Sequence, residues 1–221
     1  MLQIESLSLS YRDTRVIDDL DLSIKRGESL AIVGPSGAGK STLLSYLYQQ
    51  LKQDAALCSQ SQGLVDGLSV FHNVYMGALA RHSAVYNLLN LAWPMAGRRQ
   101  EVELLCRELY LDAPLHKPVS SLSGGQRQRV ALARALYQEK TTFIGDESFS
   151  ALDPVMAQRL LSLVKARHET VIMVLHDSEL ALSHFDRIIG LSDGKLVLDK
   201  PASLLDGEQL ACFFDTQMAT S

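Results

Sequence analysis

The stretch 31–42, which reads AIVGPSGAGKST, constrains the fold of this chain more than any other. An apolar run enters a glycine-rich turn whose backbone N–H groups can curl inward, and the helix expected after it directs its positive end at the same point. Lys40 adds a full positive charge, and Ser41 offers a hydroxyl to a cation that accompanies phosphates. The stretch therefore predicts a phosphate cradle between a buried strand and a helix.

A nucleoside triphosphate with Mg²⁺ is the ligand that this cradle predicts, since the residues complete the pattern G-x-x-x-x-G-K-[ST] from Gly34 onward. The other interpretation of the same residues is a glycine-rich turn with a solvated lysine. The residues expected to contact the nucleotide are Gly34, Pro35, Ser36, Gly37, Ala38, Gly39, Lys40, Ser41 and Thr42.

The composition sets the class of protein. A hydrophobic share of 47% in 221 residues permits a sizeable core. The net charge of −4 provides no basic field, so nucleic acid is not expected as a ligand. Cys58, Cys106 and Cys212 are scattered without CxxC spacing, which predicts reduced thiols rather than disulfides or a zinc site. Because there is no basic, apolar leader and no apolar run long enough to cross a membrane, we expect a cytoplasmic chain that does not span the membrane itself.

Hydrophobic periodicity divides the chain into strands, a helical stretch and a second α/β region. From about 69 to 134 the pattern is helical, with Val102, Leu105, Cys106 and Leu109 on one face. The predicted fold is α/β with a central, mostly parallel sheet and an N-terminal antiparallel patch. It forms a single domain over 1–221, with a helical subdomain inserted at approximately 66–134. The predicted strands are 2–10, 16–25, 29–33, 55–59, 143–144 and 170–175; the predicted helices follow 40, cover 156–167 and follow 177, before a hairpin at 192–194.

Two further stretches carry chemistry. LSGGQRQR at 122–129 predicts a second anion-binding helix start, although Ser123 is also a good residue for a plain helix cap. The stretch FIGDE at 143–147 is an apolar strand that ends in paired carboxylates, which suits a P-loop protein. Asp146 would hold Mg²⁺ through water and Glu147 would polarise the attacking water. The alternative for this pair is an exposed loop.

With these motifs in this order, the sequence resembles the ATP-binding-cassette family over essentially its whole length. The LSGGQ motif is the most specific element. The resemblance implies a P-loop cassette that binds ATP with Mg²⁺ and hydrolyses it. It also implies that two copies stack head to tail, so that each ATP lies between the cradle of one copy and Ser123, Gly124, Gly125 and Gln126 of the other.

Four more residues take roles from the same resemblance. Tyr11 would stack on adenine, and Asp153 would couple the two sites. Gln60 would sense Mg²⁺ and the attacking water, and His176 would contact the γ-phosphate. Taken alone, three of these residues also fit plainer roles. Tyr11 would pack within a strand, Gln60 would be an amide on the surface, and His176 would be a hydrogen-bonded histidine at the end of a strand. The implied catalytic residues are Glu147, His176 and Gln60, and the implied metal site is Ser41, Gln60 and Asp146.

The stretches 63–77 and 83–94 resemble the ATPase subunits of phosphonate importers in particular. This likeness implies the ATP-hydrolysing subunit of a membrane importer that energises uptake of a phosphonate or a related oxyanion. The implied location is peripheral, on the cytoplasmic face of the cell membrane. The implied partners are integral membrane permease subunits, a second copy of the chain and a solute-binding protein.

In the family, the helical insert is hinged at Gln60 and receives a helix from the membrane subunit. Leu64, Val65, Leu68 and Phe71 are therefore candidate docking residues. The alternative is that their side chains form the core of the insert.

The sequence departs from the family at the acidic pair. Gly145 stands where a larger apolar residue is usual, and Ser148 stands where proline is usual. Both carboxylates remain. Because glycine weakens a strand and the loss of proline frees the backbone, we expect a looser strand end and slow or poorly coupled turnover.

The interval between Ser41 and Gln60 is also shorter than is usual in the family. It predicts a helix that runs almost directly into the strand at 55–59, and an antiparallel patch built from the N-terminal strands alone. The Gln60 loop would then have less structural support, and the coupling between Mg²⁺ sensing and a docked partner would be weaker.

Three other functions remain open. A soluble cassette ATPase that regulates a macromolecule is one, although such proteins usually carry two cassettes or long insertions. A P-loop kinase would not need the LSGGQ stretch. A degenerate subunit that does not hydrolyse ATP would fit Gly145 and Ser148.

Overall fold

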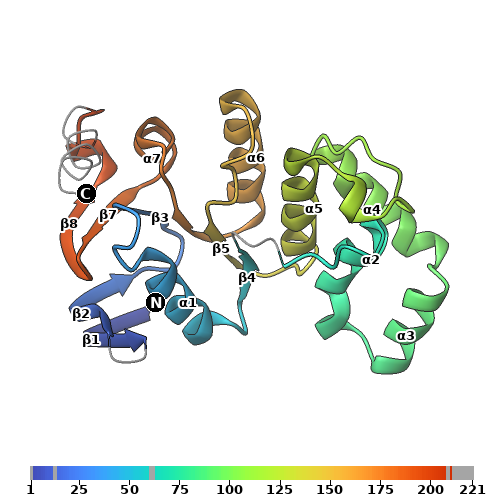
Figure 1. The fold of residues 1–221 in the computed structure, drawn as a ribbon, viewed down its shortest axis with the longest axis horizontal. Helices are drawn as coiled ribbons and strands as arrows, with labels where there is room; N and C mark the ends of the chain where they lie inside the picture. The colour runs from blue at the N-terminus through green and yellow to red at the C-terminus, as the bar shows by residue number, and fades with distance from the viewer. Residues whose placement is uncertain (1, 12–13, 60–62, 208–209, 211–221) are drawn as a thin grey trace. The chain divides into compact units, whose positions relative to one another are not determined.

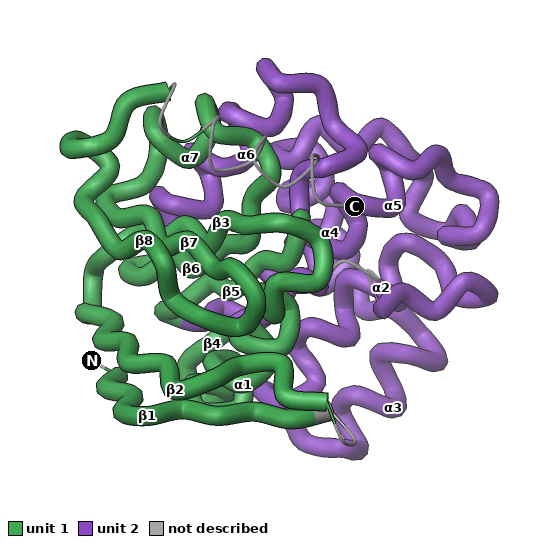
Figure 2. Tube along the Cα trace, turned by 60° about the vertical axis from the view of Figure 1, so that its left-hand side comes forward, with its two compact units in different colours: residues 1–55, 141–147, 168–221 green, residues 56–140, 148–167 purple. Residues whose placement is uncertain are grey.

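The computed structural model describes residues 2–11, 14–59, 63–207 and 210, and it forms two compact units, which are treated separately (Figures 1 and 2). Unit 1 comprises Met1–Ala55, Thr141–Glu147 and His168–Ser221, and unit 2 comprises Ala56–Lys140 and Ser148–Arg167. The predicted insert at 66–134 lies within unit 2. The assignment of the whole chain to one domain stays a prediction.

A sheet of mostly parallel strands forms the centre of unit 1 (Figure 1). The central strand, β3 (Ser29–Val33), pairs in parallel with β6 (Thr170–Val174) on one side and with β7 (Arg187–Ser192) on the other. On the outer sides, β6 pairs in parallel with β5 (Thr142–Asp146), and β7 pairs antiparallel with β8 (Lys195–Pro201) in a hairpin. The inner strands are buried along their whole length, as continuous apolar runs in parallel sheets are. In spatial order the strands are β5, β6, β3, β7 and β8.

The N-terminal patch is a two-stranded antiparallel sheet of β1 (Leu2–Tyr11) and β2 (Thr14–Ile24). Its inward face is apolar, with Ile17, Leu20 and Leu22 buried. The described residues of unit 1 also form α1 (Lys40–Leu51), α7 (Ser178–His184) and the short 3₁₀ turn η3 (Ala202–Leu204). The predicted fold class is confirmed, with its parallel sheet, antiparallel patch and helices.

The short interval after α1 behaves as the sequence predicts. The helix ends at Leu51, and the described residues from Lys52 to Ser59 hold a single strand, β4 (Ala55–Cys58). The Thr142 N–H donates to the Asp54 carbonyl at 2.9 Å, just before this strand. The reduced patch is therefore confirmed, whereas weaker coupling to a partner stays a prediction.

Unit 2 is helical apart from the end of β4. The predicted apolar face is buried, since Val102, Leu105, Cys106 and Leu109 are each at most 6% exposed. Aromatic rings extend this core: Phe71 stacks on Tyr75 with ring centroids 5.6 Å apart. Its helices are α2 (Val70–Tyr75), η1 (Met76–Arg81), α3 (Ala84–Ala92), α4 (Ala96–Glu108), η2 (Val119–Ser121), α5 (Gly124–Leu136) and α6 (Pro154–Arg167).

Two expectations from the sequence are wrong. Phe71 is only 3% exposed because it packs in the core of unit 2, so it is not a docking residue, whereas Val65 and Leu68 are exposed. Ser148 is not loose either, because the residue is 2% exposed and its hydroxyl donates to the Cys58 carbonyl at 3.1 Å. That bond restrains the backbone where the family has proline.

No helix within the described residues is both long enough and apolar enough to cross a membrane.

Candidate functional site

The phosphate cradle connects β3 to α1 in unit 1. Lys40 is only 6% exposed, and its Nζ donates to the carbonyls of Gly34 at 2.7 Å and Pro35 at 2.6 Å. This burial excludes the solvated lysine that the sequence left open. Helix α1 has no side-chain cap and no acidic residue in its first turn, so its N-terminal N–H groups are available to an anion.

The surroundings of Lys40 act on its pKa in opposite directions. Burial lowers the pKa of the Lys40 ammonium, because a low-dielectric site disfavours the charged form. The carboxylates of Glu147 and Asp146 oppose this shift and favour the charged form. The cation therefore lies within electrostatic reach of both acidic residues.

Asp146, a residue that is 9% exposed, ends β5. Burial raises the pKa of Asp146, while a hydrogen bond with the Ser41 side chain and the nearby charge of Lys40 oppose the rise. Its Oδ1 atom is buried and has no hydrogen-bond partner among the described residues. An unpaired buried carboxylate oxygen beside a serine hydroxyl is a donor set that fits Mg²⁺.

Glu147 follows directly and is held by His176. The Nε2 atom of His176 lies 2.5 Å from Oε1 of Glu147, and because a carboxylate can only accept, the imidazole donates. Glu147 has a left-handed backbone with φ of 50°, which is uncommon for a non-glycine residue, and its N–H donates to the Val174 carbonyl at 3.3 Å. The acidic pair is thus built into the end of β5 and is not an exposed loop.

A backbone carbonyl of strand β2 packs against the cradle, a contact that the motifs did not predict. A Cβ added at Gly39, whose φ is +97°, would lie 2.8 Å from the Val16 carbonyl oxygen. A Cβ at Gly194, in the turn between β7 and β8 with φ of +76°, would lie 2.4 Å from the same oxygen. One carbonyl therefore fits against both glycines, and only the Asp193–Gly194 turn sequence hinted at the second.

A substitution at Gly194 should therefore weaken nucleotide binding without touching the nucleotide. In Gly194→Ala, the added methyl must displace Val16, which lies against Gly39 in the cradle. We expect the dissociation constant of a fluorescent ATP analogue to rise about tenfold or more, as for a loss of roughly 1.4 kcal/mol. Gly27→Ala is the matched control, because Gly27 also has a positive φ, +85°, but no atom within 4 Å of the added carbon. If both variants bind the analogue equally, the support by Val16 does not matter.

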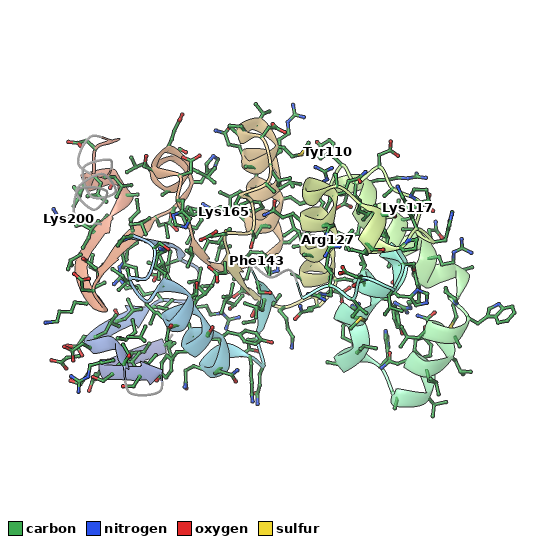
Figure 3. The ribbon with its side chains drawn as sticks, in the orientation of Figure 1. Tyr110, Lys117, Arg127, Phe143, Lys165 and Lys200 are labelled. Carbon is green, nitrogen blue, oxygen red and sulfur yellow. The ribbon has the colours of Figure 1, made fainter. Side chains whose placement is uncertain are left out.

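The LSGGQ segment lies in unit 2 at the start of α5. Ser123 is a true N-cap: its hydroxyl accepts from the Gln126 N–H at 3.3 Å, and the Gln126 side chain accepts from the Ser123 N–H at 3.0 Å. The cap interpretation is therefore correct, and it is compatible with anion binding because Ser123 and Gly124 remain exposed. Farther along the helix, Arg127 pairs with Asp66 at 2.7 Å (Arg127 is labelled in Figure 3).

Asp153 also lies in unit 2, directly before α6, and its Oδ1 accepts from the Met156 N–H of that helix at 2.9 Å. Gln60 and the side chain of Tyr11 lie outside the described residues, so their predicted roles stay predictions. Among the predicted residues, unit 1 brings together the cradle, the acidic pair and His176, and unit 2 holds Asp153 and the residues of the LSGGQ motif.

Residues 17–150 match the family model described as ABC transporter. The chain belongs to the ABC transporter family. It is accordingly an ATPase of the ATP-binding-cassette type.

Named relatives of this ABC ATPase extend over nearly all of the chain. The Phosphonates import ATP-binding protein PhnC 1 of Natronomonas pharaonis is 39% identical over 97% of this chain and 100% of its own length. The Phosphonates import ATP-binding protein PhnC of Pseudomonas putida is 35% identical over 99% of this chain and 91% of its own length.

A solved structure shares the fold. It is titled as the dimeric structure of a post-hydrolysis state of the ATP-binding cassette MJ0796 bound to ADP and Pi. With a TM-score of 0.76 it covers 91% of this chain and 99% of its own, at 24% identity.

Proposed function

We propose that this ABC ATPase is the energising subunit of a membrane importer for phosphonates or related oxyanions. The observation that carries the hydrolytic part is the Glu147 carboxylate, held 2.5 Å from His176 at the end of the strand beside the cradle. The importer part rests on the likeness to the two phosphonate import proteins over almost the whole chain.

In this proposal the residues of unit 1 bind the triphosphate and activate water. Lys40 and the N–H groups at the start of α1 hold the phosphates, and Glu147 polarises the attacking water. His176 orients the Glu147 carboxylate and, as the family resemblance implies, contacts the γ-phosphate. Tyr11 stacks on adenine, and Gln60 senses the metal and the water, as the family resemblance implies.

Mg²⁺ is proposed as the accompanying cation. Ser41 and Asp146 fit it, because the Ser41 hydroxyl meets a carboxylate whose other oxygen is buried without a partner among the described residues. Gln60 completes the proposed set. When bound there, Mg²⁺ would neutralise part of the charge of the phosphates.

The electrostatics of Asp146 give a test of this site. Since burial raises its pKa above the unfolded value of 3.8, ionised Asp146 destabilises the nucleotide-free protein at neutral pH. That cost is relieved as pH falls through the raised pKa. We expect Asp146→Asn to melt at a higher temperature than wild type near neutral pH without nucleotide and Mg²⁺, with the difference shrinking in acid, and to lose Mg²⁺-dependent hydrolysis. Melting curves across pH check this; equal melting temperatures at every pH would contradict it.

The proposed partners follow from the importer role. A second copy of the chain supplies Ser123, Gly124, Gly125 and Gln126 to each ATP, and Asp153 couples the two sites. Integral membrane permease subunits receive the energy and hold the ATPase on the cytoplasmic face of the membrane. A solute-binding protein delivers the substrate.

Cell fractionation followed by affinity capture of the tagged chain tests the importer role. We expect the chain in the membrane fraction, together with an integral membrane permease whose presence stimulates ATP hydrolysis. Recovery of an active ATPase from the soluble fraction alone, with no membrane partner, would support the regulatory ATPase instead. Uptake of phosphonate compared with phosphate in cells lacking the chain then tests the substrate.

A further inference from the structure

The backbone of Glu147 has a conformation that is unfavourable for its residue type. Its φ of 50° lies in the left-handed region, which residues other than glycine rarely adopt. Such a conformation costs free energy and persists only where the surrounding structure holds it in several ways. Because the backbone sets the direction of the side chain, it also decides whether the Glu147 carboxylate reaches His176, whose Nε2 lies 2.5 Å away. The contacts that hold this stretch of backbone therefore bear on hydrolysis.

Two hydrogen bonds hold the chain on the two sides of this residue. The Glu147 N–H donates to the Val174 carbonyl at 3.3 Å. Glu147 is joined by its next peptide bond to Ser148, whose hydroxyl donates to the Cys58 carbonyl at 3.1 Å. Ser148 and Cys58 are each 2% exposed, so water is not at hand to replace this bond if the hydroxyl is removed. The serine hydroxyl thus fixes the chain directly after the strained residue.

The structure around the serine is itself well anchored. Ser148 and Cys58 both belong to unit 2, and Cys58 ends the buried strand β4. The chain continues into Phe149, which is 5% exposed, and the Ala151 N–H donates to Oε1 of Gln128 at 3.1 Å. A hydrogen bond to β4 therefore ties the end of the acidic pair to a part of the structure that is closely packed.

We propose that Ser148 is a positioning residue for ATP hydrolysis. Its hydroxyl, held on the Cys58 carbonyl, keeps the Glu147 backbone in its left-handed conformation and so keeps the carboxylate directed for activating water. The inference rests on the proposed role of Glu147. In the family pattern a proline ring would restrain the chain at this position locally, whereas here a bond to a distant strand does so.

Replacing Ser148 by Ala in the purified full-length chain tests this role. We expect kcat for ATP to fall about tenfold, since a small misplacement of a catalytic group is costly. The KM and the dissociation constant of ATP should stay within about twofold, because the residue acts on the chemical step and not on binding. Ser148→Thr, which keeps the hydroxyl, should turn over faster than Ser148→Ala.

Ser29→Ala is the matched control for a general loss of stability. Ser29 is 3% exposed, and its hydroxyl donates to Oδ2 of Asp186 at 2.6 Å. It begins β3, at the end of that strand away from the cradle. We expect this variant to melt at a lower temperature than wild type and to keep its kcat within about twofold. An equal fall of kcat in Ser29→Ala and Ser148→Ala would overturn the proposal.

A double variant shows whether Ser148 acts through Glu147. In Glu147→Gln the carboxylate is already absent, so adding Ser148→Ala should lower the remaining single-turnover rate by less than about twofold. A further tenfold fall would show that Ser148 acts independently of Glu147, and would overturn the proposal.

The two roles can fail separately. Near-normal turnover in Glu147→Gln would exclude the proposed role of Glu147 itself. A large loss in Glu147→Gln together with wild-type kcat in Ser148→Ala would overturn only the role of Ser148.

Discussion

Replacing Glu147 by Gln is expected to lower ATP hydrolysis by a factor on the order of 10² or more, while ATP still binds. The amide keeps the size of the side chain but cannot polarise the attacking water. Lys40 of the cradle and Asp146 at the end of β5 are unchanged, so nucleotide affinity should persist. With ATP present and hydrolysis blocked, dimers should accumulate, which size-exclusion chromatography measures.

Glu103→Gln serves as the control, since Glu103 is an exposed carboxylate on α4 that pairs with Arg107. Its turnover should match wild type. The pair of variants is to be measured on purified protein with the membrane partner present. Near-normal turnover in Glu147→Gln would exclude Glu147 as the residue that activates water.

The Ser123→Arg variant is expected to abolish ATP-driven dimerisation. Ser123 is exposed at the start of α5, and arginine there places a bulky cation where the γ-phosphate bound by the other copy should approach Gly124 and Gly125. Loss of the cap also costs about 1 kcal/mol in helix stability. Binding of ATP to the isolated monomer should survive, because the cradle is formed by other residues.

Dimerisation is best compared in the Glu147→Gln background, where hydrolysis cannot dissolve the dimer. Ser162→Arg is the matched control, since Ser162 is also an exposed serine in unit 2, on α6. It should dimerise normally. Unchanged ATP-driven dimerisation of Ser123→Arg would refute the composite site.

Much of the fold could be predicted because its elements follow from local patterns. The continuous apolar runs at β3 and β6 predict buried parallel strands, and the face of α4 that carries Val102 and Leu105 is indeed buried. The length of the interval before Gln60 limits how many strands fit there, so the two-stranded patch was also predictable. The cradle is local as well, since one short stretch supplies its strand end, turn and helix start.

Other features depend on residues that are distant in the chain. The serine at position 148 predicts a loosened backbone, yet its hydroxyl donates a hydrogen bond to a carbonyl 90 positions away in the chain. The sequence predicts Phe71 as a docking residue, but the structure buries it. Hydrophobicity alone does not show whether a side chain faces water or the core. The Val16 carbonyl that fits against Gly39 and Gly194 belongs to no motif, because it acts through its backbone and its side chain carries no signal.

The sequence by itself determined the family, the order of the elements and the chemical groups available for holding and hydrolysing a triphosphate, because spacing within short motifs sets these. Only the tertiary structure decided the state of those groups. It buries Lys40 against its own loop, leaves one oxygen of Asp146 without a partner among the described residues, and joins Glu147 to His176. It also decides which face of α3 meets water, because Asn87 of this helix bonds to residues outside it. Burial and pairing arise when distant segments pack, and no local pattern specifies them.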